Sequence, residues 1–357
     1  MRLNEIRIAN LRNIREAVVH PGPKINIIFG DNGSGKSSFL ESIHLLSRAN
    51  SFRTNHVSEI INLRARQLVV SGTIELDNRL IKKITVGLKD KKRGIRIDGV
   101  EGFSRSDLLK CFPLQFVSLI SYLLIEGPPT TRRQFLDWGV FHMEPAYSEE
   151  WKRFRRCLLQ RNTLLKAGRL AGSGVWDIEF EKYGTIVAAR RKSYLEQLVP
   201  IIQELGERIL PSKSIIIEYF PGWDLDQGLN KSLIRDFKRD FKFGFTHSGP
   251  QKSDLVLKVD GRNCKGHLSR GQIKLLVLTI KLAQIKLLID KGKAFGTLLI
   301  DDFCAELDNR NLKMLKQFLS DMDFQCFITA MDRNNLGTLC GIDPTLFHVE
   351  QGCIKIS

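Results

Sequence analysis

The chain contains 357 residues, of which 43% are hydrophobic, so it can form about two domains with sizeable cores and is not compositionally disordered. Lysine and arginine (55) outnumber aspartate and glutamate (39), and the formal net charge of +16 favours polyanionic partners such as nucleic acid. No apolar run reaches the roughly 18 residues of a membrane helix, and the seven cysteines form no CxxC pair. The composition therefore favours a cytoplasmic protein without a membrane span, a disulfide framework or a zinc site.

The first part of the chain alternates between strand and helix patterns. Apolar residues at Leu3, Ile6 and Ile8 predict a first strand, and the run at 25–29 predicts a buried strand that ends at a glycine. Residues 36–46 carry apolar residues at helical spacing. Residues 68–100 alternate again, with turn residues between the runs, and predict an antiparallel meander.

The middle of the chain is mainly helical. From about residue 130 to 210 the apolar spacing is that of helices, with a glycine- and alanine-rich loop predicted at 167–174. Short strand-like segments follow Pro211. The remaining predicted elements are a helix at 271–289, a strand at 297–300, a helix at 309–321, a strand at 325–330 and a hairpin at 346–356.

A glycine-rich segment, GDNGSGKS, separates the strand predicted at 25–29 from the next helix and matches the pattern GxxxxGK[ST]. Glycines let the backbone turn tightly, so that N–H groups and the helix N-terminus converge on phosphate oxygens. Lys36 would reach the β- and γ-phosphates as a catalytic group, and the Ser37 hydroxyl would bind Mg²⁺. The residues predicted to bind ATP here are Gly30, Asp31, Asn32, Gly33, Ser34, Gly35, Lys36, Ser37 and Ser38.

The apolar strand predicted at 297–300 ends in two carboxylates. Asp301 is predicted to bind magnesium together with Ser37, and Asp302 is predicted to be the catalytic group that polarises the attacking water. Without the glycine-rich segment, the same pair would be an acidic turn after a core strand. With it, the pair favours ATP hydrolysis.

A third motif begins the helix predicted at 271–289 and resembles the ABC-type signature. It consists of Leu268, Ser269, Arg270, Gly271 and Gln272, and Ser269 lies 232 residues after Ser37. In ABC-type ATPases this motif contacts the nucleotide of the opposite subunit, so it predicts an ATP-dependent homodimer with two composite sites. The alternative is an ordinary serine N-cap.

Together the three motifs predict an α/β fold of the ABC-type ATPase head, with a P-loop mixed sheet and an antiparallel meander. Residues 1–112 and 240–357 are predicted to form this head. Residues 113–239 are predicted to form an inserted, mainly helical lobe with a basic face.

Nearly the whole chain resembles the RecF family, recombination and gap-repair ATPases related to Rad50 and SMC heads but without their long coiled coil. Besides the Gly30–Ser37 loop, the segments that carry the resemblance are Leu11-Arg12-Asn13, Ser51-Phe52-Arg53-Thr54, GPPTTRRQFLDW (127–138), Gln160-Arg161-Asn162, GPQKSD (249–254), LSRGQIKLL (268–276) and IDDFCAELD (300–308). The resemblance implies a catalytic Q-loop role for Gln115, and a D-loop position for Asp308 across the dimer seam.

The chain departs from the family pattern in two places. FVSLISYLLIEG follows Gln115 where the family has a Pro-Glu step, and Gln251 replaces a histidine, which removes a titratable group. Thr329 lies near the position of the switch histidine of transport ATPases, and no role is assigned to it.

The resemblance also implies a function in DNA repair and replication. An ATP-dependent homodimer would clamp double-stranded and gapped DNA, and weak, DNA-stimulated ATP hydrolysis would release it. The implied partners are RecR, with RecO nearby, and the implied outcome is the loading of RecA.

A basic cluster supports a DNA partner. The segment 151–192 holds eleven lysines and arginines but three acids, which suits contacts to duplex phosphates without base readout, although a solvated helix face would have the same composition. A second basic stretch, 89–96, is expected to contribute similarly. The predicted DNA-binding residues are Lys152, Arg153, Arg155, Arg156, Arg161, Arg190, Arg191 and Lys192.

Two other classes of ATPase share these motifs. A transport ATPase would need a membrane partner and carries its signature about 100 residues after the P-loop, so the 232-residue spacing argues against it. An anti-phage ATPase of the overcoming-lysogenisation type carries an appended Toprim-like domain, for which the segment after Asp302 is expected to be too short.

Overall fold

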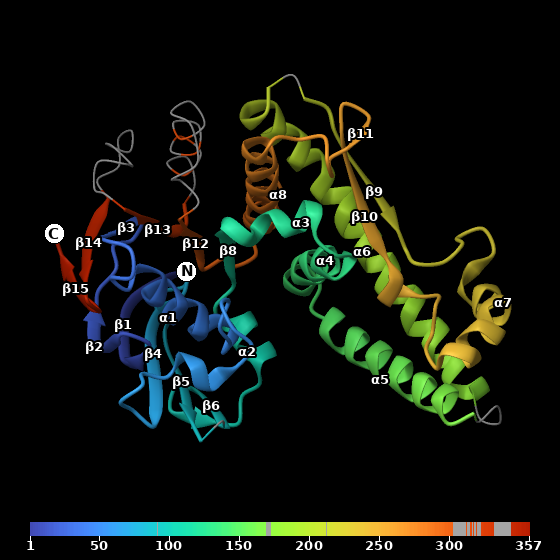
Figure 1. Cartoon of the computed structure of the whole chain (residues 1–357), viewed down its shortest axis with the longest axis horizontal. Helices are drawn as coiled ribbons and strands as arrows, with labels where there is room; N and C mark the ends of the chain where they lie inside the picture. Colours follow the sequence, from blue (N-terminus) through green and yellow to red (C-terminus); the bar gives the residue numbers. More distant parts are fainter. Residues whose placement is uncertain are drawn as a thin grey trace. The chain divides into compact units, whose positions relative to one another are not determined.

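The computed structural model describes residues 1–90, 92–168, 173–211, 213–302, 312, 315, 317, 319, 323–331 and 344–357 (Figure 1). The chain forms two compact units, one of Met1–Ser121 with Leu288–Ser357, and one of Tyr122–Leu287. These limits differ from the predicted 1–112, 113–239 and 240–357, because strands on either side of residue 240 pair with each other and keep 240–259 in the inserted unit. The assignment of residues 1–112 and 240–357 to the ATPase head remains a prediction.

The first unit contains the predicted meander. Every second residue of its strands is buried, as expected for a sheet with one face on a core. Its strand order is β2-β1-β4-β5-β6-β7, and all neighbours are antiparallel. The strands are β1 (Arg2–Leu11), β2 (Ile14–Val19), β4 (Gln67–Glu75), β5 (Ile81–Lys89), β6 (Lys92–Ile97) and β7 (Val100–Glu101).

A second sheet in this unit joins strands from both ends of the chain in the order β15-β14-β3-β13-β12-β8. All neighbours are parallel except β14 and β15, and β13 is buried along its whole length. The strands are β3 (Ile25–Phe29), β8 (Leu114–Ser118), β12 (Thr297–Asp301), β13 (Gln325–Ala330), β14 (Thr345–Glu350) and β15 (Cys353–Ile356). The strands and hairpin predicted at 25–29, 297–300, 325–330 and 346–356 are therefore confirmed.

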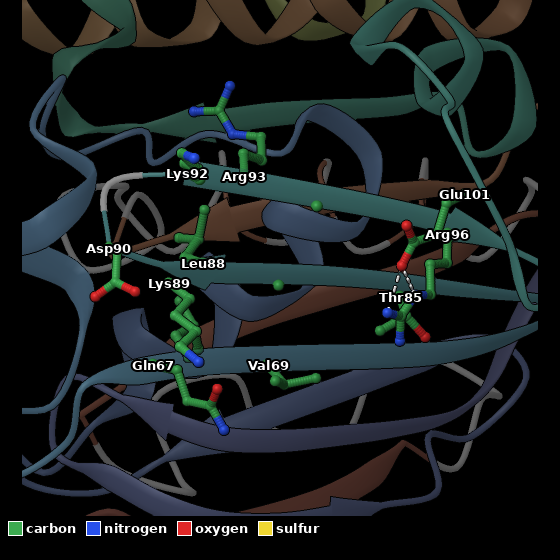
Figure 2. A pocket seen from close by; sticks show the side chains of 13 residues that line it. Gln67, Val69, Thr85, Leu88, Lys89, Asp90, Lys92, Arg93, Arg96 and Glu101 are labelled. Carbon is green, nitrogen blue, oxygen red and sulfur yellow. Dashed lines mark hydrogen bonds and ion pairs between the residues drawn. The ribbon is translucent and has the colours of Figure 1, made fainter.

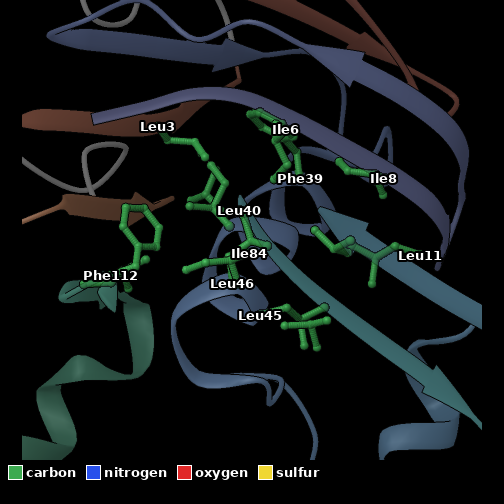
Figure 3. Close-up of a cluster of buried hydrophobic side chains, with 14 of the residues drawn as sticks. Leu3, Ile6, Ile8, Leu11, Phe39, Leu40, Leu45, Leu46, Ile84 and Phe112 are labelled. Carbon is green, nitrogen blue, oxygen red and sulfur yellow. The ribbon is translucent and has the colours of Figure 1, made fainter. Parts of the chain in front are cut away.

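Helix α1 (Lys36–Arg48) contacts both sheets, through β1, β4 and β5 on one and β8, β12 and β13 on the other. Figure 3 shows apolar side chains of β1, among them Leu3 and Ile6, gathered with Phe39 and Leu40 of α1. These side chains are fully buried, so the helix that follows the glycine-rich loop is anchored in the core of the unit. Short elements complete this unit: η1 (Val57–Ile60), α2 (Arg105–Cys111) and η2 (Leu119–Tyr122), whose last residue begins the other unit.

The second unit is mainly helical, as predicted, and carries a small antiparallel sheet in the order β11-β10-β9. Its helices are α3 (Leu123–Glu126), α4 (Pro129–Met143), α5 (Tyr147–Lys166), α6 (Ser173–Ile209), α7 (Gly228–Phe243) and α8 (Arg270–Asp290), with the short turn η3 (Pro250–Lys252). Its strands are β9 (Ile215–Phe220), β10 (Asp254–Val259) and β11 (Arg262–Asn263).

One helix of the second unit was not predicted. Only short strand-like segments were predicted between Pro211 and the helix at 271–289, but α7 lies within this region. Its buried positions Leu229, Leu233 and Asp240 have helical spacing, which the charged residues between them obscure. The predicted loop at 167–174 lies between α5 and α6 except for residues 173 and 174, which begin α6. Its residues 169–172 are outside the described residues, as is most of the helix predicted at 309–321.

None of the described helices is both long enough and apolar enough to cross a bilayer.

Candidate nucleotide-binding site

The glycine-rich loop between β3 and α1 has a conformation that only glycine adopts without strain. Gly30 and Gly35 have φ angles of 146° and 124°, and a Cβ on Gly30 would lie 2.2 Å from the carbonyl oxygen of Val349. The Lys36 ammonium is buried inside the loop, where Nζ donates to the carbonyl oxygens of Gly30 (2.7 Å) and Asp31 (2.9 Å). The loop therefore holds its cation at the position where phosphates would enter.

Two neighbouring turns brace this loop from outside. The carbonyl oxygen of Ser34 accepts hydrogen bonds from Asn13 Nδ2 (2.8 Å) and from the backbone N–H of Gly352 (2.8 Å). Asn13 lies in the turn between β1 and β2, and Gly352 lies in the turn of the β14–β15 hairpin. Asn13 belongs to the Leu11-Arg12-Asn13 segment that resembles the family, but the sequence assigned no role to it. In the structure its side chain positions the glycine-rich loop.

The paired carboxylates lie at the carboxyl end of β12, beside the loop. Ser37 Oγ donates to Asp301 Oδ1 at 3.0 Å, which brings together two residues that are 264 positions apart. Thr329, in the adjacent β13, donates to the same Asp301 oxygen at 2.9 Å, and its Oγ1 accepts the backbone N–H of Asp302 at 2.8 Å. Parallel pairing of β12 with β13, and of β13 with β3, places all these groups at one edge of the sheet.

Burial raises the pKa of the Asp301 carboxyl, and the nearby Asp302 carboxylate raises it further, while hydrogen bonds from Thr329 and Ser37 oppose the shift. Burial beside a second acid disfavours the ionised state of Asp301. A divalent cation would reverse that balance, because its charge favours the carboxylate form. The electrostatics of this pair thus fit a Mg²⁺ ligand.

Two buried hydroxyls also fit a bound nucleotide. Ser34 Oγ in the loop and Ser118 Oγ at the carboxyl end of β8 have no hydrogen-bond partner among the residues that the structure describes. Ser118 pairs in register with Asp301, so its hydroxyl is at the same edge of the sheet. Buried polar groups are normally satisfied, and both hydroxyls can serve a triphosphate or a metal-bound water.

The structure does not support the predicted Q-loop role of Gln115. Gln115 is the second residue of β8 and pairs in register with Leu298, whereas Asp301 pairs with Ser118. Three residues of a strand span about 10 Å, so Gln115 lies well below the edge where the phosphates would bind. Its side chain is buried in the sheet. The sequence could not reveal the depth of Gln115 in the sheet, because the Pro-Glu step that follows this position in the family is replaced in this chain.

The signature-like segment begins α8. Ser269 Oγ accepts the backbone N–H of Gln272 (3.3 Å), and Gln272 Oε1 accepts the N–H of Ser269 (3.0 Å), which together form a capping box. Ser269 and Arg270 are exposed, and Leu268 is half-buried. A Cβ added to Gly271 would contact no described atom within 4 Å, so packing within the chain does not require a glycine there. Asp308 lies outside the described residues.

The predicted DNA-binding residues divide into two groups. Lys152, Arg153, Arg155, Arg156 and Lys192 are exposed, and Arg190 is half-exposed beside Glu144 and Glu150. Three of them, Lys152, Arg153 and Arg156, line one hollow of about 600 Å³ on α5 and α6.

Two members of the predicted set, Arg161 and Arg191, are wrong as DNA contacts because both are 2% exposed and internally paired. Arg191 donates to Asp137 (2.8 Å) and to the carbonyl oxygen of Pro250 (2.9 Å). Although burial opposes the charged form, the Asp137 carboxylate raises the pKa of Arg191. Arg161 donates to Asp240 at 2.7 Å. Charge composition identified these residues, but it contains no information about which helix face is buried.

A further pair of family segments also meets inside the second unit. Arg132 of the 127–138 segment donates to both carboxylate oxygens of Asp254 in the 249–254 segment, at 2.6 and 2.9 Å. Gln251, which replaces the family histidine, donates to the carbonyl oxygens of Thr246 (3.3 Å) and Ser248 (3.0 Å). In this chain these segments therefore organise the second unit.

The second basic stretch lies on the outer face of the meander. A hollow of about 530 Å³ lies over β4, β5 and β6. Figure 2 shows Lys89 and Lys92 at one end of it and Arg96 at the other. Arg96 is ion-paired with Glu101, and Gly87 faces Gly94 across the strands. The two lysines, which are opposite each other in register, have the exposure that a phosphate contact requires.

Comparison with known proteins gives consistent matches along the whole chain. The family model for the RecF/RecN/SMC N terminal domain matches residues 2–354. The DNA replication and repair protein RecF of Pseudomonas aeruginosa (strain LESB58) is 37% identical over 362 residues, which cover 99% of this chain and 98% of that protein. The RecF protein of Pseudomonas putida (strain GB-1) is 37% identical over 361 residues, with the same coverage.

Solved structures agree with these relatives. The recombination mediator protein RecF, solved as RecF–ATP in the RecFOR pathway, has a TM-score of 0.88 and 26% identity, over 99% of this chain and 97% of that one. An Smc head domain from Pyrococcus furiosus has a TM-score of 0.62 at 14% identity, over 99% of this chain and 95% of that one. The second match concerns the fold, which is that of the predicted ABC/SMC-type ATPase head.

Proposed function

The chain belongs to the RecF family of ABC/SMC-type ATPases, and from this membership we propose that it is an ATP-switched DNA-binding protein of DNA replication and repair. The observation that carries the proposal is the joined group of Ser37, Asp301 and Thr329 at the mouth of the glycine-rich loop. A P-loop serine in contact with the acid of a neighbouring strand is the arrangement that a Mg²⁺·ATP site needs.

The main polar groups of this site are assigned to steps of ATP hydrolysis. The backbone of residues 30–38 and the Lys36 ammonium hold the phosphates, and Ser37 and Asp301 hold Mg²⁺. When bound, the metal ion neutralises charge on the transferred phosphoryl group. Asp302 orients the attacking water and accepts its proton. Thr329, which contacts both aspartates, is a positioning residue for them.

The signature-like segment serves the nucleotide of a second copy of the chain. Leu268 to Gln272 place a serine hydroxyl at an exposed helix N-terminus, where a γ-phosphate is favoured. Because a Cβ at position 271 would contact no described atom within 4 Å, the space beside Gly271 is open to a phosphate group from the other subunit. Asp308 is proposed to lie at the same interface between the two copies. ATP would then join two subunits at two composite sites.

Replacing Ser269 with arginine should leave ATP binding intact and prevent the ATP-dependent dimer, because a long side chain would occupy the position of the partner's γ-phosphate. Sedimentation velocity with ATP and with ADP measures this. Ser269→Thr is the matched control, since it keeps the hydroxyl and the helix cap. Normal dimers of the arginine variant would show that the segment is not a contact in trans.

The DNA-binding face comprises the exposed residues Lys152, Arg153, Arg155, Arg156 and Lys192, with Arg190 at its edge. These contact phosphates of double-stranded DNA near single-strand gaps, where the dimer closes as a clamp and slow, DNA-stimulated hydrolysis releases it. The solved relative is named a recombination mediator of the RecFOR pathway, which supports RecR, with RecO nearby, as the partners here. Loading of RecA is then the downstream outcome of the proposed function.

Reversing the charges of Lys152, Arg156 and Lys192 to glutamate should flatten the salt dependence of duplex binding. The slope of log K against log salt should fall in magnitude by about 2–3, since each phosphate contact contributes about 0.9. Fluorescence anisotropy titrations over a range of salt concentrations measure it. The control variant makes the same change of net charge in the other unit, by replacing three exposed lysines with glutamate: Lys24, Lys83 and Lys355. Equal slopes for both triple variants would place the DNA contacts outside α5 and α6.

A further inference from the structure

The C-terminal end of α7 and the segment that follows it expose aromatic rings. Phe243 and Phe245 are 55% and 38% exposed, and their ring centroids are 6.2 Å apart. The His247 ring lies 4.3 Å from Phe245 and 5.7 Å from Phe243. We call these three rings the aromatic platform, which lies at the C-terminal end of α7, the yellow helix of Figure 1. The His247 side chain is 11% exposed, so Phe243 and Phe245 present the accessible ring faces, and exposed rings gathered at one place are characteristic of a binding surface.

Lysines lie over the platform. Lys242 Nζ is 5.6 Å from the centroid of Phe243, and Lys252 Nζ is 4.9 Å from that of Phe245. The acids nearby are already engaged, because Asp240 is fully buried and Asp236 binds Arg235 and Ser248. The region 228–252 contains six basic and two acidic residues. Its exposed charge is therefore positive, and it favours a polyanion.

The backbone under the platform is held by a buried polar network. Arg161 donates to Asp240 and to Thr246 Oγ1, both at 2.7 Å. Asp240 also accepts the backbone N–H of His247 at 2.9 Å, and Asn162 Oδ1 accepts that of Thr246 at 2.9 Å. These contacts hold Asp240 in α7 and the two residues directly after Phe245, so the backbone that carries the exposed rings is fixed. A preorganised surface loses less conformational entropy when a ligand binds.

We propose that the aromatic platform binds unpaired bases of single-stranded nucleic acid by stacking, with Lys242 and Lys252 contacting the phosphates. Aromatic faces beside a basic track are the chemistry by which proteins hold single strands. In a duplex the faces of the bases are covered by their neighbours, so the platform discriminates for an unpaired strand. The inference rests on the proposed DNA-binding function and adds a separate site for the single-stranded part of the substrate.

The test compares leucine and tyrosine variants of the full chain. Phe243→Leu with Phe245→Leu keeps the apolar surface but removes the aromatic faces, whereas Phe243→Tyr with Phe245→Tyr keeps both. Anisotropy of a labelled oligothymidine of about 20 nucleotides should show binding about 5- to 100-fold weaker for the leucine pair and within about twofold of the parent for the tyrosine pair. Duplex binding and the salt slope should not change in either variant.

Unchanged single-strand affinity of the leucine pair would overturn the proposal and leave the platform to a protein partner. An equal loss of single-strand and duplex binding would also overturn it, because the effect would not be specific to unpaired bases. Melting temperatures of both variants verify folding. ATP-dependent dimerisation and duplex retention are measured on the same samples, so a failure of the proposed function is distinguished from a failure of the platform.

Discussion

Replacing Asp302 with asparagine is expected to slow ATP hydrolysis by about 10²- to 10⁴-fold while ATP binding is retained. The amide cannot accept the proton of the attacking water, but it keeps the shape of the side chain. The backbone N–H of Asp302 still reaches Thr329 Oγ1, so the end of β12 should remain in place. Single-turnover hydrolysis and equilibrium binding of a fluorescent ATP analogue separate the two effects.

The matched variant is Asp301→Asn, in the adjacent position. It keeps an oxygen that can accept the Ser37 hydroxyl but removes the carboxylate charge that would bind the metal, and it should therefore weaken the magnesium dependence of nucleotide binding, which the Asp302 variant leaves unchanged. The Asp302 variant should also accumulate ATP-bound dimers, because hydrolysis no longer separates them. If both aspartate variants hydrolyse ATP at the parent rate, the assignment of the two carboxylates is wrong.

Replacing Lys36 with arginine is expected to abolish ATP-dependent dimerisation and to reduce hydrolysis by at least about 100-fold. Lys36 is 5% exposed, and its ammonium fits between the carbonyl oxygens of Gly30 and Asp31. A planar guanidinium presents its donors in a fixed fork and cannot replace that compact charge. Sedimentation velocity with ATP and nucleotide binding by fluorescence measure the result.

Lys24→Arg serves as the control, since it makes the same substitution at an exposed lysine of the same unit. The loop itself should stay folded in the Lys36 variant because Asn13 and Gly352 hold it from outside. A melting temperature close to the parent value would verify this. An ATP-dependent dimer that forms normally in the Lys36 variant would contradict the site.

The sequence by itself determined the elements whose pattern is local. The strand before the glycine-rich loop, the helix after it, the meander and the strand that ends at Asp301 all follow from periodicity and from short contiguous motifs. The local backbone of such motifs is dictated by their own residues. Glycines at 30 and 35 allow the positive φ angles that the loop requires.

Only the tertiary structure decided which side chains meet and which are buried. Thr329 contacts both aspartates because β13 pairs beside β12, Asn13 reaches the loop across a separate hairpin, and Gln115 lies too deep in β8 for its predicted role. Arg161 and Arg191 count toward the positive charge of the inserted lobe, yet both are enclosed by acids from other elements. Contacts between residues far apart in the chain depend on strand order and helix packing, and composition contains neither.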